Sequence, residues 1–240
     1  MKKRSAFFLF ILLITACLLL TGFGGFWNRD RLNGSWVPTE GNGSLAFTPD
    51  GKVLGYASSG VAMWTLKSFD EKQFVLAQTL DYGSFSESSE TAMSYVLSED
   101  GKELTLTMSE MVVYDAEGKE QTRYESNASS AYRRFDDICG TWESEENQAV
   151  MELRPDGTAS SAVAGEKGPE QLLLADASTF TIITLSEETG LLETAEQFSY
   201  ALSEDGNTMT VTYETMCFYD DHGTVYDQEY HPMEMVLIRK

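Results

Sequence analysis

The sequence contains few of the residues that most often carry catalytic or metal chemistry. It has two histidines and three cysteines in 240 residues, and residues 32–135 contain neither type. The Gly-x-Ser-x-Gly, P-loop, His-Glu-x-x-His and Cys-x-x-Cys motifs are all absent. We therefore expect a protein that is not an enzyme and needs no cofactor. A hydrolase that uses carboxylates alone is the remaining catalytic alternative.

Positive charge is also scarce. The chain has 17 Lys and Arg against 38 Asp and Glu, which gives a formal net charge of −21. Nucleic acid and anionic membrane surfaces repel such a chain, so we expect neither as a partner. The acidity is interpreted as a coat that keeps the protein soluble, with attraction of cations or of a basic partner as the alternative.

The N-terminal segment differs in composition from the rest of the chain. Lys2, Lys3 and Arg4 precede an apolar run, and no acidic residue occurs before Asp30. A basic start followed by about 20 apolar residues is typical of a secretory signal or of a membrane-spanning anchor. Residues 1–28 are therefore predicted to be a signal peptide or anchor with a cytoplasmic N-terminus. The rest of the chain is expected outside the cytoplasm.

One of the three cysteines lies inside this segment. Residues 14–17, Ile-Thr-Ala-Cys, resemble the lipobox of bacterial lipoproteins, whose cysteine is lipidated and becomes the mature N-terminus. The resemblance implies that Cys17 is lipidated. An uncleaved anchor helix and free secretion are the alternatives.

The remaining sequence is an internal repeat. Residues 32–36 (Leu-Asn-Gly-Ser-Trp) recur as residues 138–142 (Ile-Cys-Gly-Thr-Trp), and residues 94–101 recur as residues 199–206. Solenoid and propeller units run about 20 to 50 residues, whereas these copies are more than 100 residues apart. The period therefore predicts a duplicated domain, and since almost no linker separates the copies we expect them to abut. The predicted domains are residues 30–135 and 137–240.

Strand signals dominate both copies. Residues 104–108 and 209–213 alternate apolar residues with polar ones, the period of a strand with one buried and one wet face. Pro-Asp-Gly at 49–51 and 155–157 is typical of tight turns. The last strand of the second copy is expected to run over residues 225–239. The inward-facing residues are predicted to be Trp36, Leu45, Phe47, Phe74, Tyr95, Leu97, Leu104 and Leu106 in the first copy, and Trp142, Met151, Leu153, Phe180, Tyr200, Leu202, Met209 and Val211 in the second.

These signals predict the fold class. About eight short strands per copy, joined by hairpins, favour an all-β chain of two consecutive antiparallel up-and-down barrels, because closing each sheet removes its exposed edges. The N-terminal signal or anchor segment precedes the two barrels.

Each copy begins with Gly-x-Trp and ends with an arginine. Trp36 and Arg134 hold these positions in the first copy, and Trp142 and Arg239 hold them in the second. The pattern resembles the lipocalin superfamily and, with the Pro-Asp-Gly hairpins, is similar to the short lipocalin-like domains of bacterial envelope lipoproteins. The resemblance implies that each Arg stacks on its Trp and closes one end of the barrel. Such a contact contributes about 0.5–2 kcal/mol.

A group of aromatic residues is specific to the first copy. These side chains could line a barrel mouth for a small apolar ligand or form the contact between the domains, and part of the group is expected to be ordinary core. The group consists of Tyr56, Trp64, Phe69, Tyr82 and Phe85.

Both histidines of the chain lie in one acidic hairpin of the second copy. Imidazole and carboxylate ligands suit a borderline metal such as zinc or nickel, and a solvated acidic turn is the alternative. The hairpin residues are Asp220, Asp221, His222, Asp227, Glu229 and His231.

The second copy also holds Cys139 and Cys217, which replace Asn33 and Val112 of the first. An oxidising compartment would permit a disulfide between them. Two independent thiols are the alternative.

Together these patterns predict a non-catalytic binding or interaction protein, tethered by its N-terminus to the outer face of a bacterial cell membrane. Its expected partners are that cytoplasmic membrane and either a small apolar ligand or an envelope protein. A structural or adaptor protein with filled barrels is the first alternative, and metal binding through the hairpin is the second. An apolar cavity of several hundred Å³ inside a barrel indicates a ligand site, whereas a packed interior is only a core.

Overall fold

The computed structural model describes residues 29–40, 43–57, 60–81, 86–144, 146, 148–220, 224–230 and 232–240. Apart from one helical turn at residues 29–32, the regular structure in these ranges is β-sheet, which confirms the all-β prediction. None of the helical structure within them is long and apolar enough to span a bilayer. Cys17 lies outside the described residues, so its lipidation stays a prediction.

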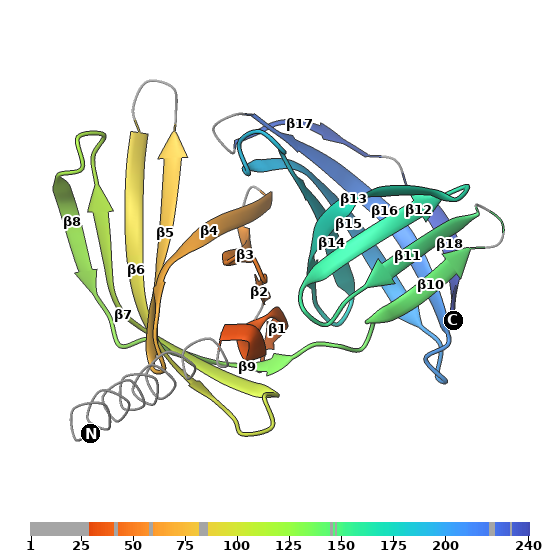
Figure 1. Ribbon diagram of the computed structural model, residues 1–240, viewed down its shortest axis with the longest axis horizontal. Helices are drawn as coiled ribbons and strands as arrows, with labels where there is room; N and C mark the ends of the chain where they lie inside the picture. The colour runs from red at the N-terminus through yellow and green to blue at the C-terminus, as the bar shows by residue number, and fades with distance from the viewer. Residues whose placement is uncertain are drawn as a thin grey trace, which may run out of the picture.

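The first repeat forms nine strands (Figure 1): β1 (Gly34–Pro38), β2 (Leu45–Phe47), β3 (Lys52–Ala57), β4 (Gly60–Phe69), β5 (Gln73–Asp81), β6 (Ser86–Leu97), β7 (Glu103–Tyr114), β8 (Glu120–Glu125) and β9 (Ser129–Arg134). Their order in the sheet is β6-β5-β4-β3-β2-β1-β9-β7-β8, and β6 also pairs with β7. This last pairing closes an antiparallel barrel of eight strands, with β8 attached to β7 alone.

The second repeat has the same topology. Its strands are β10 (Gly140–Ser144), β11 (Ala149–Leu153), β12 (Thr158–Val163), β13 (Glu166–Ala175), β14 (Thr179–Leu185), β15 (Leu192–Leu202), β16 (Thr208–Tyr219), β17 (Val225–Glu229) and β18 (Met233–Arg239). The order β15-β14-β13-β12-β11-β10-β18-β16-β17 closes through pairing of β15 with β16. The prediction of two consecutive up-and-down barrels is therefore confirmed.

The last strand of the second repeat is interrupted, so the single strand expected over residues 225–239 was wrong. The first half of β16 pairs with β18 and the second half with β17. Pro232 stands between β17 and β18, and proline has no N–H to donate to a strand ladder. The first repeat has a similar break between β8 and β9, although no proline lies there.

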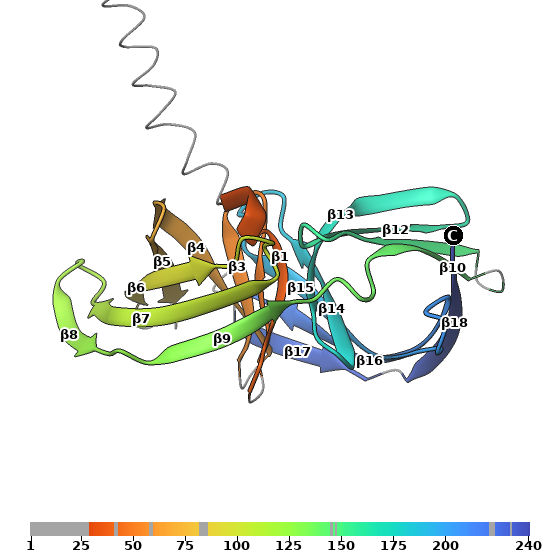
Figure 2. The same cartoon turned by 90° about the horizontal axis from the view of Figure 1, so that it is seen from below.

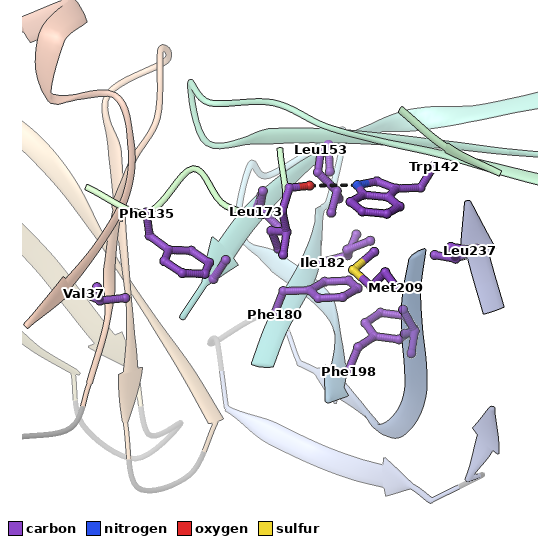
Figure 3. Packing of buried hydrophobic residues seen from close by; sticks show 14 residues of the cluster. Val37, Phe135, Trp142, Leu153, Leu173, Phe180, Ile182, Phe198, Met209 and Leu237 are labelled. Carbon is purple, nitrogen blue, oxygen red and sulfur yellow. Dashed lines mark hydrogen bonds between the residues drawn. The ribbon is translucent and has the colours of Figure 1, made fainter. Parts of the chain in front are cut away.

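Each barrel is filled by the residues that the alternating pattern places inside. All eight inward-facing residues predicted for each copy belong to its core or pack against it. Trp36, Phe74, Trp142 and Phe180 are among the largest fully buried side chains. In Figure 3 the aromatic and aliphatic side chains of the second barrel converge on one another from facing strands. The inward-facing predictions are therefore confirmed.

The two barrels lie side by side (Figure 2). They share a third core along their outer faces. On β13, Leu173 and Ala175 belong to the core of the second barrel, while Leu172 and Leu174 pack against residues of the first. Strand β13 is thus buried on both faces. The interface core contains Ala46, Leu54, Val61, Leu172, Leu174, Ile183, Leu192, Ala195 and Tyr219.

Polar contacts reinforce this interface. The Tyr219 hydroxyl accepts a hydrogen bond from the main-chain N–H of Val61 at 2.9 Å. The Ser35 hydroxyl of the first barrel accepts one from the N–H of Ala175 at 3.2 Å. Because these bonds satisfy groups that the contact buries, the barrels dock in one defined arrangement.

Candidate functional site

The closed end of each barrel is formed by the tryptophan and arginine that the lipocalin resemblance singled out. Register places Trp36 opposite Arg134 and Trp142 opposite Arg239. The guanidinium carbon lies 5.7 Å from the ring centroid in the first pair and 4.5 Å in the second. Each indole N–H also donates to the carbonyl of the residue four positions earlier, at 2.7 and 2.8 Å. These contacts connect the first and last strands of each barrel.

The two arginines differ in what else they bind. Arg134 donates through Nη2 to the carbonyls of Asn33 and Pro155, both at 2.7 Å. Because Pro155 belongs to the second barrel, Arg134 also links the two repeats. Arg239 donates to the carbonyl of Asp137 at 2.8 Å, while its buried Nε has no hydrogen-bond partner.

The middle of each barrel is filled by stacked aromatic rings. In the second barrel the Phe180 and Phe198 rings lie 4.8 Å apart between centroids, and Tyr213 lies 5.2 Å from Phe198. In the first barrel Phe74 and Tyr95 lie 5.8 Å apart. These rings belong to the packed core of each barrel or lie against it.

The opposite half of each barrel is lined less tightly, and the two copies differ there. In the first barrel Leu76, Thr91 and Met111 are cross-strand neighbours on the inward face, and all three are half-buried. In the second barrel Glu196 takes the place of Thr91, between Ile182 and Met216. Burial raises the pKa of the Glu196 carboxyl. One interior is therefore neutral at this level and the other holds a carboxyl group.

The three described members of the aromatic group specific to the first copy, Tyr56, Trp64 and Phe69, do not gather at one barrel mouth. Trp64 and Phe69 pack against the core of the first barrel. Tyr56 faces outward, where its hydroxyl lies 2.9 Å from Thr181 Oγ1 of the second barrel, and burial raises its pKa. Tyr56 thus contributes to the domain contact, one of the two roles expected for the group. Tyr82 and Phe85 lie outside the described residues.

The predicted metal-binding hairpin is described only in part, because Asp221, His222 and His231 lie outside the described residues. Asp227 and Glu229 are cross-strand neighbours of Phe218 and Met216, and Asp220 accepts a hydrogen bond from the N–H of Thr224. Among the described side chains, no three His, Cys, Asp or Glu form a group that could hold a metal ion. The metal site stays a prediction.

Cys139 and Cys217 are free thiols, which corrects the disulfide prediction. Cys139 lies near the same end of the barrel as Asn207. It directly precedes β10, whose Trp142 pairs with Arg239, and the N–H of Arg239 donates to the carbonyl of Asn207. Cys217 is ten positions beyond Asn207 along β16. At about 3.4 Å per residue, Cys217 therefore lies roughly 30 Å along the strand direction from the end of the barrel where Cys139 lies. A disulfide requires Cα atoms within about 7 Å.

Three hollows lined by described residues lie away from the packed centres of the barrels. One is at the rim of the second barrel and two lie between the barrels. The largest of the three has a volume of about 450 Å³. We call it the acidic groove. It is lined by Pro49, Asp50, Asp156, Thr158, Glu170, Leu172, Ile183 and Leu185.

Both Pro-Asp-Gly turns contribute to this groove, one from each barrel. The approach of the second-copy turn to the first barrel depends on glycine: a Cβ on Gly34 of β1, whose φ is +119°, would lie 2.3 Å from the carbonyl oxygen of Pro155. A Cβ on Gly157 would lie 2.9 Å from the carbonyl oxygen of Phe47. Only residues without a side chain allow such contacts. The duplicated turn therefore serves both as a hairpin and as part of the domain contact.

The floor of the groove is apolar and its rim is acidic. Leu172 and Ile183 are cross-strand neighbours on the outer face of β13 and β14. Asp156 accepts hydrogen bonds from Thr158, including one from Oγ1 at 2.7 Å. Glu170 is paired with Arg154 at 3.0 Å. Arg154 also pairs with Glu152 at 2.7 Å, so its charge is shared between two carboxylates.

One strand that lines this groove has a recognisable signal in the sequence. Residues 172–175 (Leu-Leu-Leu-Ala) break the alternation seen in other strands, and a continuous apolar run is typical of a strand buried on both faces. The run indicates that something covers the outer face of β13. It does not indicate that the other repeat does so.

No protein-family model matches this sequence, and no curated protein matches it either. The likeness to lipocalin-like domains therefore rests on the two barrels and on their Trp–Arg pairs.

Proposed function

We propose that this chain is a non-catalytic, extracytoplasmic interaction protein, tethered to the cell membrane by its N-terminal segment. In this proposal the two barrels form one structural body, and their outer surface binds a partner. The observation that carries the proposal is the position of the largest of the three hollows, which lies between the barrels, whereas aromatic rings pack against one another inside each barrel. The two-barrel architecture is compatible with a lipocalin-like binding fold.

The membrane tether rests on the N-terminal composition. Lys2, Lys3 and Arg4 followed by an apolar run support export, and Cys17 is the residue proposed to carry the lipid. Metabolic labelling with a fatty acid should mark the wild-type protein and leave Cys17→Ser unmarked. Equal labelling of both proteins would exclude lipidation at this cysteine.

A second candidate function is the binding of a small apolar ligand in the first barrel. It is favoured by the half-buried inward row that contains Leu76, Met93, Met111 and Val113. Apolar residues that keep partial exposure on a concave face are what such a ligand would cover.

Titration with an environment-sensitive fluorescent fatty acid tests the proposal against this second candidate. If the barrels are filled, the purified full-length protein should give no saturable fluorescence increase beyond that of the detergent alone. Saturable binding that Met111→Glu abolishes would overturn the proposal and assign the first barrel a ligand. Val96→Glu is the matched control, because Val96 is 70% exposed and pairs with Thr105 on the outer face of the same two strands.

A further inference from the structure

We propose that the acidic groove binds a lysine- or arginine-bearing segment of a partner protein. The inference rests on the proposed function, for which it names the class of partner. The carbon chain of one basic side chain would lie on Leu172 and Leu185, and its charged group would reach the carboxylates of the rim.

The shape of the groove suits such a side chain. Its volume of about 450 Å³ lies within the range of roughly 300–1,000 Å³ that is typical of ligand pockets. Leu185 is half-buried and Leu172 keeps 8% exposure, so both leave some apolar surface for an occupant to cover. Lys and Arg commonly lay their carbon chains along apolar surface while their charged groups stay in water. An anionic or wholly apolar occupant would leave the acidic rim unmatched.

Charge complementarity favours a basic occupant. Asp50, Asp156 and Glu170 come from three separate segments of two barrels and reach the same hollow. Arg154 is the cation paired with one of them, and it is shared with Glu152. Arg29 and Arg134 donate to the carbonyls of Pro49 and Pro155 in the two turns beside the groove. The side chains that line the groove itself include three carboxylates and no lysine or arginine. A chain with a net charge of −21 also attracts basic partners over longer distances.

Two exposed acidic turns among the described residues lack this combination. Asp100 and Asp205 lie in equivalent exposed turns, where each accepts hydrogen bonds from neighbouring residues of its own turn. Neither lines any of the three hollows. The second hollow between the barrels contains Arg133 beside Asp176, so its charges are balanced. Of these three hollows, the acidic groove alone is lined by carboxylates from both repeats together with apolar side chains.

The test uses a short fluorescent peptide of alternating Lys and Ala, with a Glu–Ala peptide as its counterpart, and the purified full-length protein in a neutral detergent. We expect saturable binding of the basic peptide that weakens as salt rises, and no binding of the acidic one. Exposed ion pairs are worth about 0.2–1 kcal/mol, so the double variant Asp50→Asn/Glu170→Gln should weaken binding by roughly 2- to 30-fold. Leu185→Lys should abolish binding, because it places a basic side chain in the groove itself.

The control is Asp100→Asn/Asp205→Asn, which removes the same charge from open turns and should bind like wild type. If the control loses as much affinity as the groove variant, the attraction is non-specific and the inference fails. Carbodiimide cross-linking gives an independent readout: peptide lysines should couple to Asp50, Asp156 or Glu170, and coupling spread over unrelated carboxylates would overturn the site. Circular dichroism establishes that each variant is folded.

Failure of this inference is distinguishable from failure of the proposed function. If the basic peptide does not bind and the fatty-acid titration is also negative, the groove assignment is overturned while the filled-barrel account stands. A positive fatty-acid titration overturns the filled-barrel account whatever the peptide does.

Discussion

The contact between the barrels can be tested by removing one side chain from its centre. Leu54 lies on β3, is fully buried, and belongs to the interface core together with Leu174 and Ile183 of the second barrel. Its neighbour Val53 belongs to the core of the first barrel. Leu54→Ala therefore removes packing between the repeats and leaves the interior of the first barrel intact.

The expected cost follows from this burial. Replacement of a fully buried Leu by Ala typically destabilises a protein by about 2–5 kcal/mol, because apolar contacts are lost and a cavity remains. Domains have a free energy of unfolding of about 5–15 kcal/mol, so the change is large. If the interface couples the barrels, wild type should unfold in urea as one transition. The variant should unfold at a lower urea concentration, and the unfolding transitions of the two barrels should begin to separate.

Urea unfolding followed by circular dichroism measures this loss. Val96→Ala is the control, because Val96 is 70% exposed and exposed substitutions usually change stability by less than about 0.5 kcal/mol. A double-mutant cycle with Leu174→Ala should give a coupling of about 0.5–3 kcal/mol. If Leu54→Ala costs no more than Val96→Ala, or if the cycle is additive, the barrels do not pack as described.

Three further predictions concern single groups. The closer approach of Arg239 to Trp142 should give a double-mutant coupling of about 0.5–2 kcal/mol, larger than that of the first-barrel pair, and additivity would contradict the stacking. Burial raises the pKa of the Cys139 thiol to about 12, so at pH 8 iodoacetamide should alkylate it far more slowly in the folded protein than in urea; equal rates would contradict its burial. The raised pKa of Glu196 means that its ionised form destabilises the fold, a penalty that is full above the folded pKa and absent below the unfolded one. Glu196→Gln should therefore raise the urea midpoint at pH 7 and leave it unchanged at pH 3.5, and an equal gain at both values would contradict this assignment.

The sequence indicated the barrels well because their determinants appear twice. The Pro-Asp-Gly turns are local hairpin signals, whereas each tryptophan meets its arginine across the first and last strands of its repeat. Comparison of the two repeats distinguished these residues, which occur in both copies, from residues that occur in one copy alone. Period-two alternation then placed the inward-facing side chains without knowledge of the tertiary structure.

What could not be predicted depends on how distant elements meet. Two cysteines in an oxidising compartment, Cys139 and Cys217, made a disulfide possible. In the structure they lie too far apart along the barrel to form one. Tyr56 was recognisable as an aromatic specific to the first copy, but its partner Thr181 lies 125 residues away. The acidic groove exists only because two turns of different repeats come together. No local pattern encodes that contact.

Native mass spectrometry of the protein purified from its host tests the central claim most directly. This claim is that the barrels are filled and that the surface around them binds the partner. The account predicts that the released protein has the mass of the processed chain with its N-terminal modification and retains no other small molecule. A stoichiometric apolar molecule that stays bound in the gas phase and is lost on unfolding would contradict the account and place the ligand inside a barrel.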